Sequence, residues 1–351
     1  MSHSAEPAPK AFHLANSLDE FPDTLKGGVV GIGNFDGVHR GHQAVLERVM
    51  EEAASRSVPG YLMTFEPHPR AFFAPQKPFF RLTPPHAKAE IVRAFGLDGM
   101  LVLPFDADFA AREASEFVEH ILAQRLGIVH AVTGYDFHFG RKRSGTPDYL
   151  RSSGETLGFG VSIVERVHDE GGETISSSRI REDIAKGEVV EANALLGYRW
   201  FVEGEVQGGD RRGRELGYPT ANIALDPACE IAHGIYAVRV VIDGVLHDGV
   251  ANYGRRPTFD NGAVVLEVHV FDFKGDLYGK TLGVTFVSYL RGEEKFASID
   301  ALIAQMDLDS AEARAAIASL RPLSPLDLAL YDIPRADDGP GLQAPDDAGA
   351  A

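Results

Sequence analysis

The sequence predicts two domains, an α/β domain followed by a mainly antiparallel β domain. Its 351 residues exceed the length over which one hydrophobic core usually keeps growing. From Lys26 to Lys186, strand-like apolar runs alternate with helix-like stretches, a pattern typical of a parallel sheet covered by helices on both faces. From Trp200 onward, runs rich in valine, tyrosine and phenylalanine are separated by glycine and aspartate turns, which favours an antiparallel sheet or a small barrel. We expect the domain boundary near residues 186–195.

Four apolar runs are the expected strands of the first domain. They occupy residues 28–33, 61–65, 100–103 and 128–133. Between them, apolar residues recur at the spacing of one helical face. These helical positions are Val45, Leu46, Val49, Met50 and Ala53, then Ala89, Val92 and Phe95, and then Phe117, Val118, Ile121 and Leu122. Because ligands of such sheets bind at the carboxyl ends of the strands, the loop after the first run is a candidate site.

The second half predicts strands over 200–206, 235–242, 264–271 and 282–289. Helical spacing returns at 299–306 and 311–320. The segment 335–351 is rich in proline, glycine and aspartate, and we expect it to be disordered.

Composition restricts the partners and the compartment. With 44% hydrophobic and 24% charged residues the chain has the balance of a soluble globular protein, and no apolar run of spanning length occurs. Acidic residues outnumber basic ones 51 to 34, giving a net charge of -17, which disfavours binding to polymeric nucleic acid. Cys229 is the single cysteine, so an internal disulfide is excluded and a reducing compartment is favoured. With no secretory signal at the N-terminus, we expect a cytoplasmic protein without membrane partners.

The loop Gly33–His42, of sequence GNFDGVHRGH, indicates phosphate binding at the start of a helix. Its glycines allow a phosphate chain to approach the backbone, and the first helical turn offers unpaired N–H groups. His39 and His42, three residues apart, lie on the same side of that turn and can both donate to phosphate oxygens as charge builds up. Two other interpretations are surface histidines without a role and a zinc site, which lacks an obvious third ligand nearby. His68 is interpreted as a turn residue.

The segment 174–181 offers serine hydroxyls that can cap a helix or hold phosphate. Its Arg181 can neutralise a leaving pyrophosphate.

In the second half, Thr220 and Asn222 place two neutral oxygens on one face of an extended segment, which suits Mg²⁺. An ordinary Gly-Pro turn entering a strand is the alternative. Glu267, within the apolar run 264–270, is either a solvated outer residue or a general base. The segment Gly275–Thr281 is similar to a Walker phosphate loop, but it has three residues between its glycines instead of four, so we interpret it as a turn.

At these residues the chain resembles the bacterial bifunctional riboflavin kinase/FMN adenylyltransferase family, also called FAD synthetases. The resemblance lies in the loop 33–42, in 64–69, 80–83 and 133–140, and in 175–181, where Ser178 replaces the usual threonine. In the second half the matching segments are 219–222, 234–236, 249–252, 266–269 with 276–279, and 290–296. Gly208 departs from the histidine that the family often has there.

The resemblance implies a Rossmann-like nucleotidyltransferase fold over residues 14–187, and a six-stranded β-barrel riboflavin kinase domain with C-terminal helices over 188–334. It implies a set of site residues for each half. In the first half these are Gly33, Phe35, Asp36, Gly37, His39, Gly41, His42, Ser177, Ser178 and Arg181 for ATP, with Phe65 and Asp136 for the flavin. In the second they are Gly213, Thr220 and Asn222 for ATP, with Thr220 and Asn222 also for Mg²⁺, Glu267 for catalysis and Arg291 for the flavin.

The implied function is phosphorylation of riboflavin to FMN and adenylylation of FMN to FAD, with ATP as co-substrate and Mg²⁺ as cofactor. We expect a monomer or weak homo-oligomer. Two alternatives stay open at this point. One is a nucleotidyltransferase for another phosphorylated acceptor, such as a nicotinamide or pantetheine phosphate. The other is a flavin-binding protein without catalytic activity.

Overall fold

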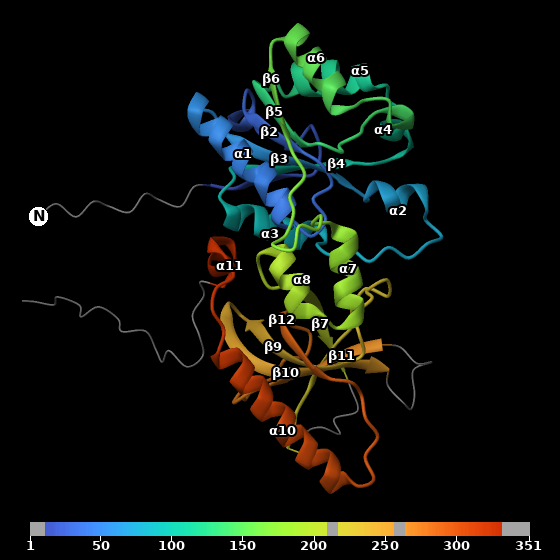
Figure 1. Cartoon of the computed structure of the whole chain (residues 1–351), viewed down its shortest axis with the longest axis vertical. Coiled ribbons are helices and arrows are strands. Elements are labelled where there is room, and N and C mark those ends of the chain that lie inside the picture. The colour runs from blue at the N-terminus through green and yellow to red at the C-terminus, as the bar shows by residue number, and fades with distance from the viewer. Residues whose placement is uncertain (1–10, 209–216, 256–263, 332–351) are drawn as a thin grey trace, which may run out of the picture. The chain divides into compact units, whose positions relative to one another are not determined.

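The computed structural model describes residues 11–208, 217–255 and 264–331, and it divides into two compact units (Figure 1). Unit 1 comprises residues up to Trp200 together with 226–232 and 322–330, and unit 2 comprises 201–225, 233–321 and the residues from 331. The expected boundary at 187/188 stays a prediction for the functional domains. The compact units divide later, because residues 188–200 pack with the first unit. The expected disordered segment 335–351 lies outside the described residues.

Unit 1 is built on a parallel sheet in the order β1-β4-β3-β2-β5-β6. Its strands are β1 (His13–Ala15), β2 (Val29–Ile32), β3 (Gly60–Glu66), β4 (Gly99–Pro104), β5 (His130–Gly134) and β6 (Gly160–Val164). The four predicted strands are β2 to β5. The short β1 and the half-buried β6 at the two sheet edges were not predicted, because neither forms a long apolar run.

The helices of unit 1 follow the strands. They are α1 (Arg40–Arg56), α2 (Pro69–Phe73), α3 (Pro85–Phe95), α4 (Ala107–Ala110), α5 (Ala114–Glu116), α6 (Pro147–Leu157), α7 (Ser177–Lys186), α8 (Val189–Leu196) and α11 (Pro325–Leu330). Single turns of 3-10 helix, η1 (Asp23–Leu25) and η3 (Arg141–Arg143), and a π-helix, η2 (Phe117–Arg125), complete the unit.

Helices cover both faces of the sheet, as predicted. On one face, Val30 and Ile32 of β2 belong to the same buried cluster as Phe117 and Ile121 of η2. On the other face, α1 packs closely over Gly31, where an added Cβ would stand 2.9 Å from Val49 Cγ2. A larger residue there would push α1, and the loop that precedes it, away from the sheet.

Unit 2 is a closed barrel in the order β10-β11-β8-β7-β12-β9, and all of its strand pairs are antiparallel. Its strands are β7 (Phe201–Gln207), β8 (Ala221–Ile223), β9 (Gly234–Ile242), β10 (Val245–Arg255), β11 (Val264–Val270) and β12 (Thr281–Arg291). This confirms the six-stranded barrel. The short β8 and the long β10 were not among the predicted strands.

The helix α10 (Ile299–Ala318) packs against the barrel through Ala313 and Ile317, which join Ala237 and Val287 in one buried cluster. The two helical segments expected over 299–306 and 311–320 are therefore one continuous helix. Aspartates at 307 and 309 interrupt its apolar pattern, but they do not break the helix, since Asp309 is buried in an ion pair.

Candidate active sites

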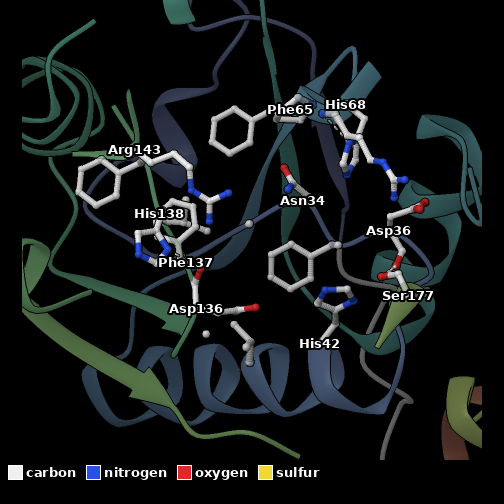
Figure 2. A pocket seen from close by; sticks show the side chains of 18 of the residues that line it. Asn34, Asp36, His42, Phe65, His68, Asp136, Phe137, His138, Arg143 and Ser177 are labelled. Atoms are coloured by element: carbon white, nitrogen blue, oxygen red, sulfur yellow. Dashed lines mark hydrogen bonds between the residues drawn. The ribbon is translucent and has the colours of Figure 1, made fainter. Parts of the chain in front are cut away.

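The first candidate site lies at the topological switch point of the sheet in unit 1, where the strand order reverses. From β2 the strand order runs through β3 to one edge and through β5 to the other. In parallel α/β sheets, ligands bind in the crevice at such a point, beyond the carboxyl ends of the strands. A cavity of about 960 Å³ opens there, lined by residues that follow β2 and β5 (Figure 2).

The histidines of the predicted loop lie together at the start of α1. His39 is the N-cap residue, and its Nδ1 accepts a hydrogen bond from the His42 N–H at 3.3 Å. The two rings stack with centroids 3.7 Å apart and an interplanar angle of 20°. Because His39 Nδ1 accepts, its ring proton is on Nε2 and can be donated to a ligand. The three-residue spacing thus brings both imidazoles to one side of the turn, as predicted.

Both histidines are neutral at physiological pH. Burial lowers the pKa of His39 to about 4, partly offset by the Asp36 carboxylate. Burial also lowers the pKa of His42 well below its usual value, and the neighbouring His39 and Lys88 lower it further. In the described residues the buried Nδ1 of His42 has no hydrogen-bond partner. Two neutral imidazoles suit hydrogen bonding to phosphate oxygens, which is the role that the sequence predicts for them.

The loop backbone is strained, and side chains hold it in place. Phe35 and Val38 adopt positive φ angles of 48° and 38°, which bulky and β-branched residues rarely do. Every carbonyl oxygen from Asn34 to Val38 accepts a hydrogen bond from a side chain. The donors are Lys88 Nζ and Thr64 Oγ1 to Asn34, Thr83 Oγ1 to Phe35, Ser177 Oγ to Asp36, Tyr198 Oη to Gly37, and Gln43 Nε2 to Val38, at 2.6 to 3.5 Å. The electronegative carbonyl oxygens of the loop are therefore all hydrogen-bonded to side chains of the protein.

Asp36 and Arg181 form a buried ion pair beside the loop. The Arg181 guanidinium donates to the Asp36 carboxylate and, through Nε, to the Phe80 carbonyl at 2.6 Å. The other Asp36 oxygen accepts from the Thr83 N–H at 3.1 Å. Asp36 is 3% exposed, so its carboxylate positions Arg181 and the loop from behind. The structure therefore brings together the first predicted loop and the distant segment 174–181.

The other predicted ATP-binding residues of this half also line the cavity, except Gly37, which is buried beside it. Gly33 and Gly41 both line the cavity in crowded positions, because an added Cβ would stand 2.9 Å from the Phe35 ring and 3.1 Å from the His39 ring, respectively. Ser176 caps α7, and Ser177 and Ser178 follow it at the helix start. Ser178 is exposed, so its replacement of the family's threonine leaves a hydroxyl at the cavity surface.

The cavity has an aromatic region and a cationic region. Phe65 packs against Phe105 and Phe109, with centroids 6.1 and 5.5 Å away. Asp136 stands opposite, on the loop after β5 (Figure 2). The cationic lining comes from side chains that are scattered along the sequence, which are Arg70, Arg112, Arg141, Lys142, Arg143, Arg166 and Arg181. A chain of net charge -17 thus concentrates positive charge around one cavity.

His68, interpreted from the sequence as a turn residue, also borders the cavity (Figure 2). It caps α2 by accepting the Arg70 N–H at 3.0 Å, and its ring lies 4.6 Å from the Phe79 ring. Burial lowers its pKa to about 4. The sequence signal was available in the motif 64–69, but a lone histidine between prolines resembles an ordinary turn.

The second candidate site lies on three adjacent strands of the barrel in unit 2. The strand register places Glu267 of β11 directly opposite Asn222 of β8 and, on its other side, Asn252 of β10. Directly opposite residues of antiparallel strands share one face of the sheet. Thr220 precedes β8, while the predicted Gly213 lies outside the described residues. Gly208, where the family often has histidine, is exposed at the end of β7.

Glu267 is half-buried and alternates with the buried Leu266 and Val268. It therefore lies on the face opposite to the one that these two apolar residues share. Asn252 is a candidate that residue pattern alone missed. Its Oδ1 is buried without a hydrogen-bond partner in the described residues, which makes it available to a ligand group.

Arg291, predicted to contact the flavin, has its nitrogens occupied. Nε and Nη2 donate to the two oxygens of Asp309 on α10 at 2.8 and 2.7 Å, and Nη1 donates to the Gly292 carbonyl at 2.9 Å. The pairing with Asp309 raises the pKa of Arg291. A flavin at this residue would meet the flat face of the guanidinium.

Comparisons with known proteins match both halves of the chain. The family described as FAD synthetase matches residues 21–179, and the family described as riboflavin kinase matches residues 196–317. The bifunctional riboflavin kinase/FMN adenylyltransferase of Pseudomonas fluorescens is 42% identical over 303 residues, covering 86% of this chain and 97% of its own length. The enzyme of the same name from Listeria monocytogenes is 36% identical over 311 residues, covering 88% and 98%.

A solved structure from Streptococcus pneumoniae titled a macrolide-efflux protein is also similar. It is 32% identical, has a TM-score of 0.77, and the match covers 86% of this chain and 98% of that one. In the residues that the structure describes, we find no helix with the length and apolar character needed to cross a membrane. Through its two matching families and its relatives over most of its length, the chain belongs to the bifunctional riboflavin kinase/FMN adenylyltransferase family of flavin cofactor biosynthesis.

Proposed function

We propose that unit 2 phosphorylates riboflavin to FMN with ATP, and that unit 1 then adenylylates FMN to FAD with a second ATP. The observation that carries this proposal is the loop 33–42 at the switch point of the sheet. It presents two stacked neutral imidazoles to a cavity that has both aromatic and cationic lining. Such a cavity suits a flat flavin ring joined to phosphate groups.

In the adenylyl step, an oxygen of the FMN phosphate attacks the α-phosphorus of ATP. A new P–O–P bond forms, the bond to the β-phosphate breaks, and pyrophosphate leaves. His39 and His42 donate hydrogen bonds to the phosphate oxygens on which charge develops. Arg181 neutralises the leaving pyrophosphate, held in position by Asp36. Ser178 offers its hydroxyl and the start of α7 offers backbone N–H donors, while the Ser177 hydroxyl donates to the Asp36 carbonyl and so holds the loop.

The flavin ring occupies the aromatic region of the same cavity. Phe65 supplies a ring face there, and Asp136 a carboxylate from the loop after β5. Phe65 and Phe109 are already in contact with each other, so an added ring extends an existing aromatic cluster. His68, neutral and at the cavity edge, is a further donor or acceptor in this region.

In the kinase step, Glu267 is the general base. It takes the proton of the ribityl 5′-hydroxyl as that oxygen attacks the γ-phosphorus of ATP, and ADP leaves. Asn222, directly opposite Glu267, and Thr220 bind the ATP phosphates, together with Gly213. Arg291 offers the face of its guanidinium to the flavin ring, since Asp309 occupies its edge.

Thr220 and Asn222 also suit a Mg²⁺ ion. Their hydroxyl and amide oxygens are the hard, neutral ligands that Mg²⁺ accepts alongside water and substrate phosphates. The buried amide oxygen of Asn252, on the other side of Glu267, adds a third neutral oxygen to this face. When bound, the ion neutralises negative charge on the ATP phosphates.

The proposed functional domains are residues 14–187 for adenylyl transfer and 188–334 for the kinase. We propose riboflavin, FMN and ATP as the small-molecule partners, a monomer or weak homo-oligomer as the assembly, and the cytoplasm as the location. Nucleic acid and membranes are not proposed partners, given the net charge of -17 and the ordinary globular composition.

The proposal is tested by incubating the purified protein with riboflavin, ATP and Mg²⁺ and separating the flavins by chromatography. The wild type should form FMN and then FAD. His42→Ala should stop at FMN, and Glu267→Ala should form no FMN yet convert supplied FMN to FAD. The expected loss at either residue is about 100-fold or more.

Matched controls are His120→Ala and Glu312→Ala, which remove an exposed histidine from unit 1 and an exposed glutamate from unit 2. Both should retain both reactions. Absence of FMN and FAD with the wild type would overturn the proposal, and loss of both reactions in either site variant would contradict two separate sites.

A further inference from the structure

Lys88 is a buried cation that contacts the backbone of the loop 33–42. It lies on α3, is 2% exposed, and its ammonium group donates to the Asn34 carbonyl at 2.6 Å and the Thr64 hydroxyl at 3.1 Å. Thr64 in turn donates to the same Asn34 carbonyl at 3.0 Å. These hydrogen-bond acceptors are neutral oxygens, so they do not cancel the charge of the lysine.

The hydrogen bonds to Asn34 fix the orientation of the peptide between Asn34 and Phe35. In a planar trans peptide the C=O and the following N–H point in opposite directions. With its carbonyl directed at Lys88, this peptide directs the Phe35 N–H away from the buried ammonium. Phe35 then takes its positive φ of 48° at the edge of the cavity, where Asn34 is exposed (Figure 2).

The charges around Lys88 leave it incompletely balanced. The two carboxylates that act on it are Asp36 and Glu66, and each is paired with an arginine. Arg81 opposes its charge, and Lys88 itself lowers the pKa of His42 and His68. The polyphosphate chain proposed for the cavity would supply the missing negative charge.

We propose that Lys88 is a positioning residue for adenylyl transfer, which holds the Asn34 carbonyl away from ATP and supplies a buried positive charge behind the phosphates. This inference rests on the proposed adenylyl transfer at the loop. Lys88 acts through the Asn34 peptide and through its electric field, which the low-dielectric interior screens only weakly.

The titration of Lys88 gives the proposal a distinctive signature. Burial lowers its pKa from the ordinary 10.5 to about 8. ATP binding should therefore weaken as the pH rises through 8, because the free protein loses the charge. The stability of the ligand-free unit should change in the opposite direction. Between pH 8 and 10.5 the unfolded chain binds more protons than the folded one, so folding becomes more favourable as the pH rises.

The test is Lys88→Met, assayed for FAD formation from supplied FMN, so that only adenylyl transfer is measured. We expect the KM for ATP to rise about 10- to 100-fold at pH 7, and its increase above pH 8 to disappear. The melting temperature at pH 7 should be equal to or higher than that of the wild type, because a buried charge has been removed. FMN formation from riboflavin should not change.

Two further variants separate charge from hydrogen bonding. Thr64→Val removes the hydrogen bond from Thr64 to Asn34 and the one that Lys88 donates to Thr64, but it keeps the charge of the lysine. It should therefore raise the KM only a few-fold, with the alkaline increase retained. Lys186→Met removes an exposed lysine at the end of α7 and should behave like the wild type. If Lys88→Met fails to fold, the wild type still decides, because a KM for ATP that stays flat from pH 7 to 9.5 would overturn the proposal.

A purely structural lysine would give a different result, namely a lower melting temperature with the KM for ATP unchanged. The outcomes also distinguish this inference from the proposed function. If His42→Ala abolishes FAD formation while Lys88→Met leaves the KM and its pH profile unchanged, only the role of Lys88 is refuted. If His42→Ala retains FAD formation, adenylyl transfer at this loop is refuted.

Discussion

The two candidate sites place their functional groups by different means. In unit 1 they lie on an irregular loop whose backbone conformation is strained and whose carbonyls bond to side chains from distant segments. In unit 2, Asn222, Glu267 and Asn252 lie side by side because the strand ladder fixes their register. A loop that must present N–H groups to phosphate needs support from many residues, whereas a strand receives it from its neighbours. Removing one supporting side chain should therefore harm unit 1 more than unit 2.

The largest effect is expected for Asp36→Ala. The change leaves Arg181 without its carboxylate in a buried position and removes the acceptor of the Thr83 N–H. Breaking a buried pair from one side costs about 3–5 kcal/mol. Urea unfolding should show this loss in unit 1, with FAD formation abolished and FMN formation retained. Asp23→Ala, which removes an exposed carboxylate of the same unit, is the control, and equal effects of the two would refute the special role of Asp36.

Acid should destabilise unit 1 through its buried histidines. The folded pKa of His39 is about 4, below its ordinary 6.5, so the unfolded chain takes up a proton first as the pH falls. Stability is therefore lost between pH 6.5 and 4, by roughly 3 kcal/mol for this residue. Thermal melts of the wild type and of His39→Gln at pH 7 and 4.5 measure the difference. A variant that loses as much stability as the wild type would contradict this account.

In unit 2, the effect of Asn222→Ala should be confined to ligand binding. The strand ladder remains, so the melting temperature of the protein should change little. The Mg²⁺ concentration for half-maximal FMN formation should rise about 10-fold or more, because one oxygen ligand is lost. Chelation with EDTA should stop FMN formation in the wild type. An unchanged Mg²⁺ requirement in the variant would exclude Asn222 as a ligand.

The smallest effect is expected for Tyr198→Phe. It removes one neutral hydrogen bond, the one to the Gly37 carbonyl, worth about 1 kcal/mol. FAD formation should fall about 5-fold while FMN formation stays the same. Tyr149→Phe, at a half-exposed tyrosine of α6, serves as the control. Equal loss of both reactions in Tyr198→Phe would show that the loop is not what this hydroxyl supports.

The sequence predicted the residues of the first site better than the side chains that hold its loop in place. The glycines and histidines of loop 33–42 lie within ten consecutive residues. Their position between a predicted strand and a predicted helix could therefore be recognised from the sequence. Lys88 and Tyr198 come from α3 and from the end of the first unit, and nothing in their local sequence distinguishes them from surface residues. Their role arises from tertiary contacts that no periodicity encodes.

In the fold, too, features with a local sequence pattern were predicted and the others were missed. Strands with continuous apolar runs, such as β2 and β4, were predicted because both of their faces are buried. The short β8 and the edge strand β1 were missed because each has only three residues. Arg291 was named through the family resemblance, and its ion pair with Asp309 could not be predicted because it depends on the packing of α10 against the barrel.

The buried pair between Arg199 and Asp327 bears on the order of folding during synthesis. Asp327 of α11 also accepts the Arg199 N–H at 3.0 Å and the Leu323 N–H at 3.0 Å, all within unit 1. Domains usually complete their folding from the N-terminus as the ribosome delivers the chain. Here the N-terminal unit receives its last element, and the partner of a buried arginine, only after the whole barrel has been translated. A nascent chain that stops before α11 should thus carry a barrel complete in sequence beside a first unit that is still open to proteolysis.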